Sequence, residues 1–180
     1  IPLDLSRPEA QEIVRNLVAK ADVVTENFAP GVMERFGLSY EELRRIKPDI
    51  IILSMPGWGS VGPWRDRVSY GGQVLSASGL GYIWGHPESL PNARAKFPYA
   101  DFLAAVHAAF SAAIALFYRG RTGEGRAIEA AQQEAMGHAM GLPLLDYFLN
   151  GNRGEPRGND HLDFSPHGVY PCRGDDAWAA

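Results

Sequence analysis

Residues 49–55, which read DIIILSM, restrict the possible folds of this chain more than any other stretch. The run is apolar and rich in β-branched residues, and it lacks the alternation of a strand with one face in water. Such a run is typical of a parallel strand that is covered on both faces. We therefore predict a buried parallel strand here and an α/β fold around it.

The chain before this strand supports the same fold. Apolar residues at helical spacing predict a helix after Pro8, and residues 21–26 read as a short strand. A short helix follows, and then YEELRRI with Ser39 as its N-cap. Residues 1–5 look like the end of an earlier strand. This alternation predicts a partly parallel sheet with flanking helices.

One apolar segment dominates the second half. From Phe102 to Phe117, fourteen of sixteen side chains are apolar, and only His107 and Ser111 interrupt them. The run is shorter than the roughly 18 residues that a membrane span needs. We therefore interpret residues 101–118 as a buried core helix and expect no association with a membrane.

Two further elements follow that helix. Residues 126–131 (RAIEAA) predict another strand, and residues 131–151 predict a second helix, kinked at Pro143. From residue 152 onward the chain reads as loop, with GVYPC at 168–172 as a candidate strand.

Charge and cysteine content exclude several classes of protein. The net charge is −4 without a run of Lys or Arg, so we expect no binding to nucleic acid. Cys172 stands alone and cannot form an internal disulfide, which suits a cytoplasmic location. The chain begins without methionine, so a targeting segment ahead of Ile1 stays an open alternative. The five histidines lack the spacing of metal ligands, and we expect no metal site.

The segment GWGSVG, residues 57–62, matches the glycine pattern of dinucleotide-binding proteins and follows a predicted strand. Pro63 and Trp64 come next, and nothing there predicts a helix whose N-terminus would face a pyrophosphate. We therefore disfavour a nicotinamide oxidoreductase. A helix that began directly after Gly62 would reverse this interpretation.

Asp101 stands at the mouth of the apolar helix, and two roles fit it. Aspartate is a favoured N-cap, since its carboxylate accepts hydrogen bonds from the first backbone N–H groups. The positive end of the helix dipole also favours an ionised carboxylate, the form that acts as a nucleophile. The residues alone leave both roles open.

Four stretches, taken in order, resemble the family III CoA-transferases, which include formyl-CoA transferase, carnitine CoA-transferase and α-methylacyl-CoA racemase. They are residues 21–38, 48–64, 99–131 and 168–178. The first contains ADVVTENFAPG, and the third contains the turn RGRTGEG. Together they cover most of the chain.

The resemblance implies a large Rossmann-like domain, a smaller second domain and two chains that interlock as a homodimer. On this basis residues 1–150 are the central part of the large domain, truncated at both ends. Residues 151–180 would then begin the connection toward a small domain outside this chain.

The resemblance also implies an activity and a nucleophile. In the transferases an aspartate at the start of this helix attacks the substrate, and the matching residue is Asp101. CoA would move from an acyl-CoA donor to a carboxylic acid acceptor through an aspartyl anhydride and an aspartyl–CoA thioester. CoA is then a substrate, and we expect no permanently bound cofactor.

Contacts to CoA carry over as well. The resemblance assigns them to Asn27, Phe28 and Arg35, and more loosely to Phe36 and Arg67. The chemistry agrees, because arginine binds phosphate through two parallel N–H groups and apolar rings can pack on adenine.

The racemase branch of the family needs a histidine base at the start of a helix, and we align that position with Tyr70. Tyrosine is a poor base near neutral pH, so the sequence favours a transferase over a racemase. A racemase stays an alternative within the family. A non-catalytic module for CoA binding or dimerisation is the alternative from another class.

Overall fold

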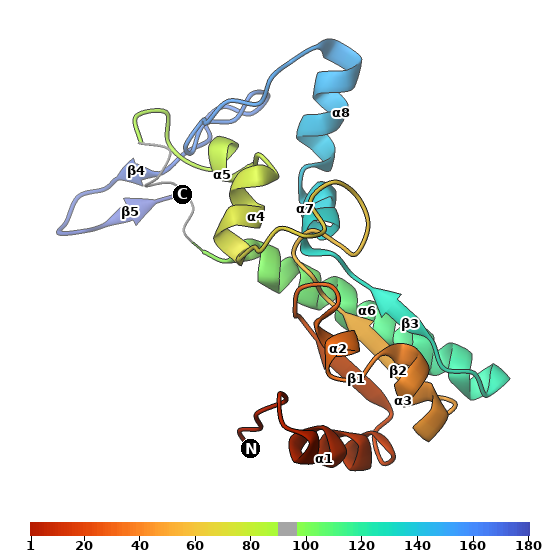
Figure 1. The fold of residues 1–180 in the computed structure, drawn as a ribbon. Coiled ribbons are helices and arrows are strands. Elements are labelled where there is room, and N and C mark those ends of the chain that lie inside the picture. The colour runs from red at the N-terminus through yellow and green to blue at the C-terminus, as the bar shows by residue number, and fades with distance from the viewer. Residues whose placement is uncertain (90–96) are drawn as a thin grey trace.

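The computed structural model describes residues 1–89 and 97–180, and its centre is a three-stranded sheet (Figure 1). The strands are β1 (Val23–Glu26), β2 (Ile51–Ser54) and β3 (Ala127–Glu129), in the order β1–β2–β3, and both pairings are parallel. The predicted α/β fold with a parallel sheet is therefore confirmed.

Helices connect and flank the strands. They are α1 (Pro8–Val18), α2 (Val32–Arg35), α3 (Tyr40–Ile46), α4 (Gly71–Ala77), α5 (Leu80–Ile83), α6 (Tyr99–Thr122), α7 (Gln132–Ala139) and α8 (Gly141–Asn150). Near the C-terminus, β4 (Tyr170–Pro171) pairs antiparallel with β5 (Trp178–Ala179). The loop predicted to hold one strand thus contains a short antiparallel pair.

The sheet is covered on both faces, as residues 49–55 predicted. Ile52 of β2 packs in one cluster with Val18 at the end of α1 and Leu43 of α3. Successive side chains of a strand point to opposite faces, so Ile51 and Leu53 face the other way. Both are buried, and α6 contacts β2.

A second apolar cluster forms where α4, α6 and α7 meet. It joins Val74 and Leu75 of α4, Ala100 of α6 and Met136 of α7, and Trp58 of the loop after β2 packs against it. Figure 1 shows β3 running toward this junction before the chain enters α7. The cluster therefore fixes the start of α6 near the carboxyl ends of the strands.

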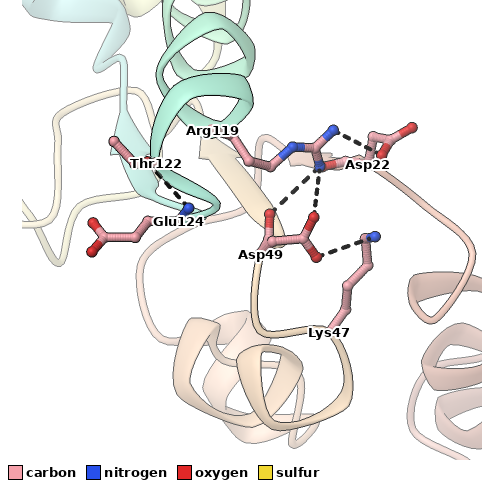
Figure 2. A network of polar contacts seen from close by, with 6 residues as sticks. All are labelled: Asp22, Lys47, Asp49, Arg119, Thr122 and Glu124. Atoms are coloured by element: carbon pink, nitrogen blue, oxygen red, sulfur yellow. Dashed lines mark hydrogen bonds and ion pairs between the residues drawn. The ribbon is translucent and has the colours of Figure 1, made fainter.

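The other end of α6 is held by charge (Figure 2). Arg119, whose side chain is 16% exposed, donates to the Asp22 carboxylate at 2.9 Å and to the Asp22 carbonyl at 3.2 Å. It also lies 3.6 Å from the Asp49 carboxylate, which Lys47 approaches to 3.2 Å from the other side. Asp22 and Asp49 precede β1 and β2, so this network ties the end of α6 to the amino ends of two strands.

The expectation that α6 is a buried core helix is wrong for the single chain. The helix buries one face made of small side chains, namely Ala100, Ala104, Ala108 and Ala115. Large apolar side chains lie exposed on the opposite face, namely Phe102, Val106, Phe110, Ile114 and Phe117. The alanines let the neighbouring elements approach α6 closely on that face only. The apolar composition of the helix does not show which face is buried.

The length of α6 also differs from the expectation. It has 24 residues, so the prediction that this segment is too short for a membrane span is wrong: by length and composition alone the helix would suffice. Of its most apolar 18-residue stretch, 22% is buried against the rest of the chain.

Two local predictions need correction. Residues 1–5 carry no strand in the described structure. The predicted kink at Pro143 is instead a break at Met140 between α7 and α8. Pro143 is the third residue of α8, where its missing N–H costs no intrahelical hydrogen bond, so the chain restarts the helix just ahead of the proline.

Candidate active site at the carboxyl ends of the strands

A cavity of about 320 Å³ lies at the carboxyl ends of all three parallel strands. The last residues of the strands, Glu26, Ser54 and Glu129, line it, together with the loop 28–31. Open α/β sheets bind their ligands at this edge. The cavity is therefore the first place to look for a substrate.

The glycine-rich segment 57–62 folds over the end of β3. The backbone N–H of Ser60 donates to both carboxylate oxygens of Glu129, at 3.0 and 3.1 Å. Gly59 has a φ of +86°, and a Cβ there would lie 3.3 Å from the same carboxylate. No helix begins within residues 63–70, and α4 starts at Gly71, so the segment is not followed by the helix whose N-terminus would face a pyrophosphate.

Asp101 is the third residue of α6, and the N-cap is Pro98. The interpretation of Asp101 as the N-cap is therefore wrong, because the helix begins at Tyr99, two residues before Asp101. Its Oδ1 accepts a hydrogen bond from the side-chain amide of Gln132 at 2.9 Å. Its Oδ2 lies against Gly71, where a Cβ would overlap it.

Gln132, the first residue of α7, is only 8% exposed and was not expected from the sequence. Its backbone N–H donates to the Pro56 carbonyl at 3.0 Å, and the N–H of Gln133 donates to the Gly57 carbonyl at 3.0 Å. These bonds tie the start of α7 to the loop after β2. Asp101 therefore lies where α4, α6, α7 and that loop converge. The sequence signal that could have indicated Gln132 as a site residue is a polar side chain just beyond the predicted strand β3.

The predicted CoA contacts near β1 lie partly on the cavity. Phe28 lines it with 41% of its surface exposed, and its N–H donates to Glu26 at 2.7 Å. Asn27 is exposed beside it. Arg35 is exposed on α2, whereas Phe36 packs against the cluster of α1, α3 and β2.

Arg67 and Tyr70 lie in and just after the loop that follows segment 57–62. The Arg67 guanidinium stands 5.4 Å from the centre of the Trp64 ring, a cation–π distance. Tyr70 is the N-cap of α4, and its side chain is 76% exposed. A helix does start at the position where we placed the racemase base, and Gly71 directly after it is the residue that Asp101 contacts.

His107 lines a second cavity of about 230 Å³, together with Ser111, Glu129 and Glu134. Its Nδ1 lies 2.8 Å from the Leu103 carbonyl. Because a carbonyl only accepts, Nδ1 is the donor in this contact. His107 is thus hydrogen-bonded along its own helix, as expected for an apolar helix face.

These features define an α/β protein with a helix-borne carboxylate beside the strand ends. Residues 1–180 match CoA-transferase family III throughout, and the chain belongs to this family.

Named relatives agree with this assignment. The chain is 35% identical over 178 residues to the succinyl-CoA–D-citramalate CoA-transferase of Chloroflexus aurantiacus, covering 99% of this chain and 44% of the relative. It is 34% identical over 171 residues to the succinate–glutarate CoA-transferase of Agrobacterium fabrum, covering 95% and 42%. The chain therefore spans less than half the length of these relatives.

A solved structure has the same fold. The crystal structure of a CAIB/BAIF family protein from Brucella suis superposes with a TM-score of 0.90 at 31% identity, over 99% of this chain and 46% of that one.

Proposed function

We propose that the protein carrying this chain transfers CoA from an acyl-CoA to a carboxylic acid, with Asp101 as the nucleophile. The observation that carries the proposal is the position of the Asp101 carboxylate, with Oδ1 held by Gln132 and Oδ2 against the bare backbone of Gly71. Relatives at 34 to 35% identity are named for exchanges of this kind. We name succinyl-CoA as the first donor to test.

The chemistry consists of four displacements. First, Oδ2 attacks the thioester carbonyl, the C–S bond breaks, and CoA leaves as a thiolate from an aspartyl–acyl anhydride. Second, the thiolate attacks Cγ of Asp101, and the bond from Cγ to the bridging oxygen breaks, which releases the donor acid. Third, the acceptor carboxylate attacks Cγ and expels CoA. Fourth, CoA attacks the new acyl carbon and frees Asp101, so each step exchanges one bond for another.

The cavity at the strand ends is the proposed entry for CoA. Phe28 lines it, Asn27 is the exposed residue before Phe28, and Arg35 stands exposed on the next helix, free of an ion pair among the described residues. We propose that Arg35 binds phosphate and that Phe28 packs on the adenine. Phe36 and Arg67 would act around these contacts, Phe36 by supporting α2 from beneath.

A racemase is the weaker candidate within the family. Abstraction of an α-proton requires a base near neutral pH. Tyr70 occupies the helix start at which the racemases of this family would carry a histidine. We therefore propose the transferase.

We also propose that a second copy of the chain covers the exposed apolar faces of α6 and α8. Both helices leave large side chains open, and on α8 these include Leu142, Phe148 and Leu149. Large apolar side chains gathered in the open on a helix mark an interface. Light scattering on the complete protein should give a dimer, and a monodisperse monomer would contradict it.

Two measurements test the proposed activity. A thermal-shift panel of acyl-CoAs should stabilise the complete protein through binding to the folded state, and the largest shift identifies the donor. With that donor, Asp101→Asn should abolish transfer of labelled CoA to acids while binding persists. Full transfer by this variant would overturn the proposal.

A further inference from the structure

We propose that Gln132 is a catalytic residue of this transfer, whose side-chain amide stabilises the negative charge on Oδ1 each time Cγ of Asp101 is attacked. The inference rests on the proposed function and adds a second residue to it. It concerns the two middle displacements only.

The donor is already in contact with a reacting group. Nε2 of Gln132 lies 2.9 Å from Oδ1 of Asp101. A carboxylate oxygen only accepts, so the amide must present its NH₂ group. When Cγ is attacked, Oδ1 becomes the oxyanion of a tetrahedral intermediate, and a donor at this distance stabilises that charge more strongly than the carbonyl before it.

The amide is held ready before the reaction. Gln132 is buried, its backbone N–H is bound to the Pro56 carbonyl, and Ala135 and Met136 on the same helix are buried beside α6. A donor that needs no reorganisation during the reaction gives the largest electrostatic effect. Burial also removes water that would compete for Oδ1.

The two oxygens of Asp101 have different surroundings, and this makes the role specific. Oδ2 faces the backbone of Gly71 and is free to attack, whereas Oδ1 keeps the amide. In the first and last displacements the charge develops on the acyl oxygen of the substrate, away from Oδ1. In the middle two it develops on Oδ1. Loss of the amide should therefore slow the formation of the aspartyl–CoA thioester and spare that of the anhydride.

The test separates these two steps in the complete protein. Gln132→Met keeps the length and burial of the side chain and removes the donor. After rapid mixing with the acyl-CoA, an acid quench followed by mass measurement counts the CoA thioester on the protein. Rapid desalting first removes free acyl-CoA, which also gives an acyl hydroxamate, and hydroxylamine then counts the anhydride on the protein as released acyl hydroxamate. We expect thioester formation to fall about 100-fold, the typical loss for one oxyanion donor, with the hydroxamate at least at the wild-type level.

Control variants make the outcome decisive. Gln133→Met alters the neighbouring glutamine, which has no described contact with Asp101, and should leave both steps within about threefold of wild type. Gln132→His, whose ring N–H can take the place of the amide, should recover part of the thioester step. If Gln132→Met does not fold by circular dichroism, Gln132→Leu, which is also apolar and supplies no donor, carries the same prediction.

Three results would overturn the inference. They are wild-type rates for both steps in Gln132→Met, an equal loss in both steps, and no recovery in Gln132→His. Asp101→Asn distinguishes this failure from failure of the proposed function: if it is inactive while Gln132→Met is not impaired, only the role of Gln132 is lost. If Asp101→Asn transfers CoA normally, the nucleophile itself is wrong.

Discussion

The two ends of α6 each carry a charged side chain, and the two charges differ in how completely they are paired. The helix has 24 residues and so spans about 36 Å. At its carboxyl end, Arg119 is satisfied by two carboxylates and their backbone carbonyls. At its amino end, the Asp101 carboxylate has one described hydrogen bond, from a neutral amide, and its second oxygen faces a glycine. A fully paired charge stabilises the fold, whereas a charge with one free oxygen is able to react.

The largest expected effect is on the amino end. Asp101→Asn should lower CoA transfer by about 10⁴-fold or more, the scale of losing a covalent nucleophile. Its side-chain oxygen still accepts from Gln132, so the unfolding free energy should change by less than about 1 kcal/mol. Isotope transfer and chemical denaturation measure the two effects. A large loss of stability with activity retained would reverse our assignment of the two ends.

Next in size is the effect of crowding the free oxygen. Gly71→Ala places a methyl group where Oδ2 lies and should displace the carboxylate, with a loss of about 100-fold in kcat. Gly72→Ala is the matched control, since a Cβ there meets nothing within 4 Å. Equal activity of the two variants would show that Oδ2 does not need its place against Gly71.

Substitutions at the carboxyl end of α6 should change the free energy of unfolding and not the activity. Arg119→Ala leaves Asp22 and Asp49 without their shared partner, and we expect a loss of about 1 to 3 kcal/mol in the unfolding free energy. The folded protein should keep its kcat within about threefold. Arg121→Ala, which alters an exposed arginine two residues further along α6, should cost less than about 0.5 kcal/mol. A kcat that falls with Arg119 while stability holds would contradict the comparison.

The smallest effect is a dependence on pH at the same end. The Lys47 hydrogen bond, followed by the attraction of Lys47 and Arg119, lowers the pKa of Asp49 below its usual 3.8. A lowered pKa in the folded state adds stability above the usual range, and this is lost as the pH falls through the folded pKa. The stability difference between wild type and Asp49→Asn should therefore shrink below about pH 4. A stability difference between the two proteins that stays constant from pH 6 to well below about pH 4 would show that Asp49 does not contribute to the network.

How far the sequence could predict this molecule depends on the range of the interactions. Residues 49–55 predicted β2 because a continuous apolar run fits one environment only, and the parallel pairing followed from it. The sequence correctly placed Asp101 at the start of the apolar helix, but the capping role was wrong, since helix starts depend on backbone geometry at Pro98.

Contacts across the fold were beyond the sequence. Gln132 is 31 residues from Asp101, and no local spacing connects them. The identity of the exposed face of α6 was beyond the sequence for a related reason: apolar composition predicts that a helix needs cover, but tertiary packing decides which face receives it within one chain.

The central claim is that Asp101 becomes covalently linked to CoA. The complete protein should be incubated with its acyl-CoA, quenched in acid, digested with trypsin and analysed by mass spectrometry. We predict a CoA thioester on the peptide of residues 97–119, located at Asp101 by fragmentation and absent from Asp101→Asn. Rapid transfer by a protein that carries CoA on another residue would contradict the account.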